Sequence, residues 1–208
     1  MQLSIKKGIG FICIPKCGST TVERFMRPSS DFSLSGNPQL KHIRYEQVQE
    51  NIWPLLAQLR LQTPYMFAIV REPVSWVESW YRFRARDELG PNEHPQHRNF
   101  SGHLSFPEYV EAVLQPHPPS YARIHSQFHY LRNKDGVVGV DEIIPLECVD
   151  TEVPALLERH NIPVAKPKER KNISQIRDAV ALPSALKDRL LAHLEKDVSL
   201  YQAGLCSS

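Results

Sequence analysis

The chain has 208 residues, of which 41% are hydrophobic and 23% are charged. This length and composition are typical of a soluble globular protein, so we expect a single domain over residues 1–208. The net charge of +2 is too small to indicate general nucleic-acid binding, and we exclude nucleic acid as a partner. Residues 1–7 do not resemble a signal peptide, and no apolar run approaches the roughly 20 residues that a membrane helix needs. We therefore expect no membrane span and a cytoplasmic location, unless the chain is a trimmed domain of an anchored protein.

The cysteine and histidine content gives no indication of a metal site. The four cysteines have neither metal-site nor disulfide-framework spacing, which favours a reducing compartment. Three histidines occur in the irregular segment 87–103, but they lack the helical spacing and the cysteine or carboxylate neighbours of zinc sites. We expect no bound metal.

The first element with chemical content is a strand, loop and helix near the N-terminus. Residues 11–14 form an apolar run that predicts a buried strand, Pro15 and Gly18 end it, and a helix follows from Ser19. The hydroxyl residues at the helix start are expected to cap its N–H groups. Such a loop directs N–H groups and the positive end of the helix dipole at one point, which suits a phosphate, and Lys16 adds a full charge. The alternative is an ordinary turn with a stray lysine.

A second buried strand is predicted over residues 65–70, and it ends at Arg71. Pro73 suits the first position of a helix that we expect to run over 74–86. Arg71 at the strand end and Ser79 two turns into the helix can grip one anion between them. Taken alone, the two residues favour the alternative of a helix-capping ion pair and a solvated hydroxyl.

The remaining elements complete an α/β pattern. We expect one helix over 45–59, or two short helices divided at Pro54. Further helices are expected over 105–114 and 121–131, from about 150 to about 160, and from Pro183 to Gly204. Ser105 is expected to cap the helix at 105–114, and Asp150 or Thr151 the helix that ends near 160. Residues 141–146 predict a third core strand. Alternation of strands and helices favours a three-layer α/β/α sandwich around a mainly parallel central sheet.

The two phosphate motifs carry a family resemblance. Pro-Lys-Cys-Gly-Ser-Thr at 15–20 resembles the 5′-phosphosulfate loop of sulfotransferases that use 3′-phosphoadenosine 5′-phosphosulfate, and Arg-Glu-Pro-Val-Ser-Trp-Val-Glu-Ser-Trp-Tyr at 71–81 resembles their 3′-phosphate motif. The second motif departs from the family at Glu72, usually Asp, and at Trp76, usually Arg. The resemblance implies a fold like that of P-loop nucleotide hydrolases.

The resemblance also implies which residues bind the donor. It places the phosphosulfate against the loop and the start of the next helix, and the 3′-phosphate against the second motif. The resulting donor-binding set is Pro15, Lys16, Cys17, Gly18, Ser19, Thr20, Thr21, Arg71 and Ser79. A basic segment near Asn172 adds Arg170 and Lys171 as a lid, although a solvated linker would have the same composition.

The resemblance further implies an acceptor hydroxyl, on a small molecule or a glycan. Carbohydrate-type members place a histidine between the two motifs, and His42 lies there, so we assign it as the general base. If His42 is only a surface histidine, the role moves to Glu46, His125 or Glu147. Gln127 is expected to face the active-site cleft, as in related enzymes.

Lys16 and His42 are thus the predicted catalytic residues of a sulfuryl transfer that needs no metal. Two other functions remain open at this point. One is a nucleotide or small-molecule kinase with an atypical phosphate loop, and the other is a nucleotide-binding protein without turnover.

Overall fold

The computed structural model describes residues 1–91, 93–164 and 181–205. The described chain divides into two compact units. The first consists of residues 1–72, 126–164 and 199–205, and the second of residues 73–91, 93–125 and 181–198. Each unit is described by itself, and the single domain expected over 1–208 remains a prediction.

The first unit is built around a mixed sheet. Within the described residues its five strands are β1 (Gln2–Ser4), β2 (Ile9–Ile12), β3 (Phe32–Ser33), β4 (Tyr65–Val70) and β5 (Glu142–Pro145), in the order β3-β1-β2-β4-β5. The pairs β2–β4 and β4–β5 are parallel, whereas β1 is antiparallel to both of its neighbours. The prediction of a mainly parallel sheet therefore holds only for the part formed by β2, β4 and β5, and the other two strand pairs are antiparallel. The strands β2, β4 and β5 are those that the sequence identified.

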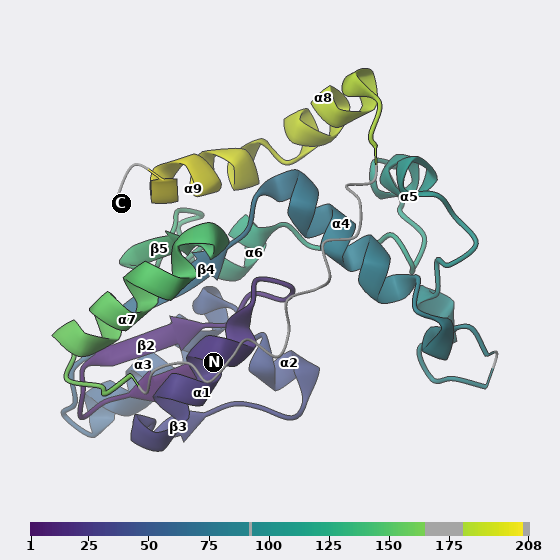
Figure 1. The fold of residues 1–208 in the computed structure, drawn as a ribbon. Coiled ribbons are helices and arrows are strands. Elements are labelled where there is room, and N and C mark those ends of the chain that lie inside the picture. The colour runs from purple at the N-terminus through teal and green to yellow at the C-terminus, as the bar shows by residue number, and fades with distance from the viewer. Residues whose placement is uncertain (92, 165–180, 206–208) are drawn as a thin grey trace. The chain divides into compact units, whose positions relative to one another are not determined.

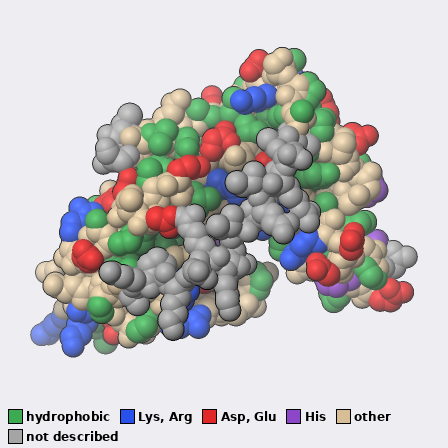
Figure 2. All heavy atoms as spheres, viewed as in Figure 1, with side chains coloured by type: hydrophobic (Ala, Val, Ile, Leu, Met, Phe, Trp, Pro, Cys, Tyr) green, Lys and Arg blue, Asp and Glu red, His purple; other side chains and the backbone are tan. Residues whose placement is uncertain are grey.

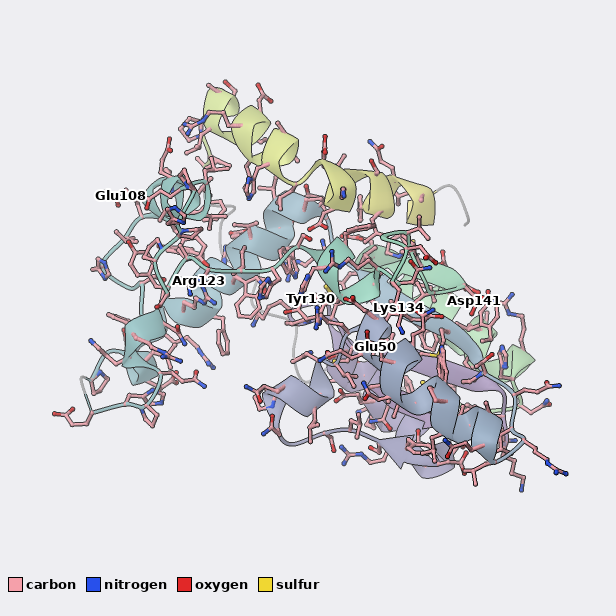
Figure 3. The ribbon with its side chains drawn as sticks, turned by 180° about the vertical axis from the view of Figure 1, so that it is seen from behind. Glu50, Glu108, Arg123, Tyr130, Lys134 and Asp141 are labelled. Carbon is pink, nitrogen blue, oxygen red and sulfur yellow. The ribbon has the colours of Figure 1, made fainter. Side chains whose placement is uncertain are left out.

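Helices flank this sheet. The helices of this unit are α1 (Ser19–Met26), α2 (Pro38–Lys41), α3 (Tyr45–Gln58), α6 (Gln127–Leu131) and α7 (Val149–Arg159), with the 3-10 turns η1 (Arg27–Ser29) and η4 (Leu146–Cys148). In Figure 1, α1 and α7 lie in front of the strands and α3 lies behind them, and Figure 3 shows the reverse order. Because both faces are covered, the residues of β4 from Met66 to Val70 are all buried, as a continuous apolar run predicts.

The centre of β2 is unusually tight. A Cβ atom at Gly10 would lie 2.4 Å from Leu3 Cδ2 and 2.4 Å from Met66 Sδ. Side chains from β1 and β4 thus meet directly over the backbone of β2. Phe11 and Phe67, paired in register on β2 and β4, add an aromatic contact with ring centroids 5.1 Å apart.

Several boundaries differ from the predictions. The strand expected at 11–14 lies at Ile9–Ile12, and the short strands β1 and β3 were not predicted. Helix α3 continues through Pro54, which decides between the one-helix and two-helix alternatives. Helix α7 follows Cys148 without a side-chain cap, and the Thr151 hydroxyl donates to the Cys148 carbonyl instead, so the predicted cap is wrong.

The second unit is helical. It contains α4 (Pro73–Arg84), α5 (Phe106–Val113) and α8 (Ser184–His193), which pack on one another, and the 3-10 turns η2 (Asp87–Leu89) and η3 (His97–Asn99). Its core includes Trp76 and Tyr109, both without exposed surface. The Ser105 side chain accepts from the Glu108 N–H and Glu108 bonds back to the Ser105 N–H, so the predicted cap of α5 is confirmed as a capping box.

The predicted C-terminal helix is two helices, α8 and α9 (Glu195–Leu205). They separate at Leu194, whose φ of −104° and ψ of 27° depart from helical values. In the part of the chain that the structure describes, no helix is long and apolar enough to cross a membrane. Acidic and basic side chains are interspersed on the face shown in Figure 2, in keeping with the small net charge.

Candidate functional site

The loop after β2 has a strained backbone. Lys16 has a φ of 67° and Gly18 a φ of 65°, so both lie in the left-handed region. For a residue with a side chain this conformation costs about 1–2 kcal/mol. Such strain clusters at functional sites, and left-handed residues in turns help to build backbone concavities that bind anions. The backbone of this loop is therefore of a kind that occurs at anion-binding sites.

Helix α1 begins directly after this loop with no side chain capping it. Its N-cap is Gly18, which has no side-chain oxygen, so the prediction that the hydroxyl residues cap this helix is wrong. Ser19 is buried and hydrogen-bonds the Cys13 side chain, whereas Thr20 and Thr21 are exposed. There is also no acidic residue in the first turn. The positive end of the helix dipole thus meets the loop with no acidic residue in the first turn of the helix, an arrangement that suits an anionic ligand.

Packing restricts the loop as well. A Cβ atom at Gly18 would lie 2.6 Å from Cδ1 of Leu146, in the turn that follows β5. Gly18 is therefore required both for its φ and for its lack of a side chain.

The second predicted motif begins at the same edge of the sheet. Strands β2 and β4 are parallel, with Ile12 opposite Ala68, so the loop and Arg71 both follow carboxyl ends of neighbouring strands. Ligands of open α/β sheets bind at such an edge. The side chain of Gln127 joins the two: Oε1 accepts from the Arg71 N–H at 2.8 Å and from the Cys17 thiol at 3.2 Å. Gln127 has no exposed surface, so the expectation that it faces a cleft is wrong.

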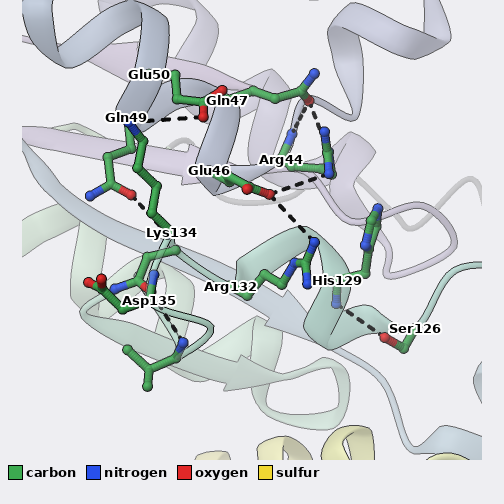
Figure 4. A network of polar contacts seen from close by, with 12 residues as sticks. Arg44, Glu46, Gln47, Gln49, Glu50, Ser126, His129, Arg132, Lys134 and Asp135 are labelled. Carbon is green, nitrogen blue, oxygen red and sulfur yellow. Dashed lines mark hydrogen bonds and ion pairs between the residues drawn. The ribbon is translucent and has the colours of Figure 1, made fainter.

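The end of α6 is joined to the start of α3 by a polar network, shown in Figure 4. Glu46 of α3 lies 3.4 Å from Arg44 and 3.7 Å from Arg132, measured between its Oε2 and their Nη atoms. Figure 3 shows Glu50 and Lys134 near each other on the side of the sheet that α3 covers, and their charged atoms are 3.9 Å apart. Ser126 caps α6 by accepting from the His129 N–H.

His42 is held in the form that a general base needs. Its Nδ1 lies 2.7 Å from the Cys13 carbonyl oxygen, which can only accept, so Nδ1 carries the proton. In the neutral ring this leaves Nε2 as the proton acceptor. Burial lowers the pKa of His42, opposed by the bond to Cys13, so the neutral ring prevails at pH 7.

The neighbouring Cys13 contacts His42, but the pKa shifts of the two groups do not favour a thiolate. Its sulfur lies 3.4 Å from Nδ1 of His42, but burial raises its pKa to about 11. A thiolate–imidazolium pair would need the opposite shifts in both groups. Cys13 and His42 therefore do not form such a pair.

The segment that carries His42 is anchored to α1. The Lys41 ammonium lies 3.1 Å from Oε2 of Glu23, whose side chain is almost entirely buried. Since α1 starts at the phosphate loop, this ion pair connects the predicted base to the predicted donor site.

Other candidates have different surroundings. Glu46 forms ion pairs with Arg44 and Arg132. Burial raises the pKa of Tyr201, and Glu147, which hydrogen-bonds this tyrosine, raises it further. Ser79 and His125 belong to the second unit, Ser79 on α4. Arg170 and Lys171 lie outside the described residues, so these assignments remain predictions. Within the described ranges, no group of three or more His, Cys, Asp or Glu side chains is arranged to hold a metal.

Comparison with known proteins gives one match, to a family model. No curated protein and no solved structure matches the chain. The model of the sulfotransferase family matches residues 3–203, which includes both phosphate motifs and nearly the whole chain. Because one family model covers nearly the whole chain, the protein belongs to the sulfotransferase family.

Proposed function

We propose that this protein transfers a sulfuryl group from 3′-phosphoadenosine 5′-phosphosulfate to an acceptor hydroxyl group on a small molecule or a glycan. The observation that carries the proposal is the loop from Pro15 to Gly18, in which Lys16 is held at a φ of 67° before an uncapped helix. Family membership supports the transfer of sulfate in general, and the sequence motifs support this donor.

In this proposal the donor lies along the edge of the sheet formed by β2, β4 and β5, as in P-loop nucleotide hydrolases. The loop N–H groups and Lys16 contact the 5′-phosphosulfate, together with Ser19, Thr20 and Thr21 at the start of α1. Arg71 contacts the 3′-phosphate, and the assignment of Ser79, which belongs to the second unit, remains a prediction from the sequence. A single nucleotide then spans the two motifs.

The reaction is an in-line displacement at sulfur. The acceptor oxygen forms a bond to sulfur while the bond from sulfur to the bridging phosphate oxygen breaks, and its electron pair leaves with that oxygen. Charge develops on the leaving phosphate, where Lys16 and the loop N–H groups stabilise it. The proton of the acceptor hydroxyl goes to Nε2 of His42, whose Nδ1 is already bonded to Cys13.

The deciding experiment compares nucleotides by calorimetry. 3′,5′-bisphosphoadenosine should bind more tightly than adenosine 5′-monophosphate, because Arg71 adds a charge-assisted contact to the 3′-phosphate. Equal affinities would refute the donor assignment.

Turnover separates the remaining alternatives. Radiolabelled donor should give labelled product with hydroxyl acceptors even in excess chelator. A requirement for magnesium with nucleoside triphosphate would instead indicate a kinase. Tight nucleotide binding without turnover on any acceptor would indicate a binding protein.

A further inference from the structure

The side chain of Gln127 connects the two motifs at the edge of the sheet. Besides the bonds to Oε1 from the Arg71 N–H and from the Cys17 thiol, its Nε2 donates to the Arg71 carbonyl at 2.8 Å. One carboxamide thus satisfies both backbone groups of Arg71, as a neighbouring strand would. The last register pair before this point is Val70 with Pro145, and proline has no N–H to continue a ladder.

Only a carboxamide can make this set of contacts. Glutamate can accept from Arg71 and Cys17 but, when ionised, has no hydrogen to donate. Methionine has nearly the same length and shape but neither a strong donor nor a strong acceptor. Asparagine carries the same group on a side chain one methylene shorter, which withdraws it from both partners.

The position of this carboxamide is itself fixed. Gln127 is the first residue of α6 and has no exposed surface. Helix α6 is capped by Ser126 and tied to α3 through Arg132 and Glu46. The amide is therefore a rigid spacer between Cys17 in the loop and Arg71 at the end of β4.

We propose that Gln127 is a positioning residue that sets the separation between the phosphate loop and Arg71. The identity of the ligand rests on the proposed function. A nucleotide with a 5′ and a 3′ phosphate has a fixed distance between these two groups. The loop and Arg71 can therefore bind both phosphates at once only when they are separated by the matching distance. Loss of the amide should therefore reduce the preference for the bisphosphate more than the affinity for a single phosphate.

The test uses Gln127→Met, with Gln47→Met as the matched control. Gln47 also accepts two hydrogen bonds through its side chain, from the N–H and Nε of Arg44, but at the start of α3. Two quantities are measured in each variant: the affinity ratio of 3′,5′-bisphosphoadenosine to adenosine 5′-monophosphate, and the rate at which a maleimide labels Cys17, followed by peptide mass spectrometry. Cys13, also buried, is the internal reference for global opening.

In Gln127→Met we expect Cys17 to be labelled at least about fivefold faster, because one buried hydrogen bond is lost, while Cys13 is unchanged. The affinity ratio should fall roughly tenfold, whereas Gln47→Met should change neither quantity. If Gln127→Met fails to fold, Gln127→Asn is measured in the same way, with the same directions expected. Unchanged labelling of Cys17 and an unchanged ratio, or equal effects in the control, would overturn the positioning role. If the wild-type chain does not distinguish the two nucleotides, the proposed function fails, and the labelling of Cys17 still decides whether Gln127 holds the loop.

Discussion

Gly18→Ala perturbs the phosphate loop at one atom. The added Cβ meets two obstacles: a φ of +65°, and Leu146 Cδ1 at 2.6 Å. The backbone strain is about 1–2 kcal/mol for a residue with a side chain. The contact with Leu146 is with the end of a side chain, which can move off its rotamer at a cost of roughly 0.5–1.5 kcal/mol.

A matched variant separates these two costs. Gly36 has a φ of +83° and nothing within 4 Å of an added Cβ, so Gly36→Ala carries backbone strain without a collision. For a chain of this size, 1 kcal/mol corresponds to roughly 2–4 °C in Tm. Gly36→Ala should therefore lower Tm by about 2–8 °C, and Gly18→Ala should lower it further by about 1–6 °C, the equivalent of the Leu146 contact.

The substitution also has a functional consequence, separate from the stability loss. If the loop moves to relieve the strain, its N–H groups and Lys16 leave their positions, and misplacement on the scale of 1 Å costs about 100-fold in turnover. We expect weaker binding of 3′,5′-bisphosphoadenosine and at least this loss of sulfuryl transfer in Gly18→Ala, with Gly36→Ala like wild type in both. Calorimetry and labelled-donor assays measure the two effects. A Gly18→Ala variant with wild-type affinity and turnover would refute the assignment of the loop.

Three further substitutions test the roles of single side chains. Lys16→Ala should lower kcat by roughly 10²–10³-fold while changing bisphosphate affinity much less, and a raised KM with unchanged kcat would show that Lys16 only holds the donor. Arg71→Ala should remove about 10–100-fold of the preference for bisphosphate over monophosphate in calorimetry, as expected for one charge-assisted contact; a retained preference would place the 3′-phosphate elsewhere. For His42, the lowered pKa means that the neutral base persists to a pH below the ordinary 6.5, so kcat/KM should decline only below that value. His42→Ala should lose this acidic limb and roughly 10²–10⁴-fold of activity, with nucleotide affinity unchanged, and an unaltered pH profile would move the base to another residue.

The core of the fold was predictable where a local pattern was strong. Strand β4 was predicted at its observed bounds because a wholly apolar run is closed by Arg71 and Pro73. Strand β1 has only three residues, two of them polar, and its pairing with β2 and β3 is not a local property. The antiparallel half of the sheet was missed for this reason.

In the candidate site, too, only features with a local sequence pattern could be predicted. The loop around Lys16 could be predicted because a lysine and a glycine lie together between a strand and a helix. The contacts of Gln127 join residues 56 and 110 positions away along the chain, and no local spacing indicates them. The tautomer of His42 likewise depends on Cys13, 29 residues earlier. The missed cap of α1 has a different origin, since the hydroxyl residues lie one position too late to be the N-cap.

The close packing over Gly10 has a consequence for sequence variation. Because Leu3 and Met66 meet above its backbone, a methyl group at this position would have to push the ends of these two buried side chains aside. Residues larger than glycine are therefore disfavoured at this position. Leu3 and Met66 should then vary as a pair among homologues, a smaller side chain at one being accompanied by a larger one at the other, so that their combined volume stays constant.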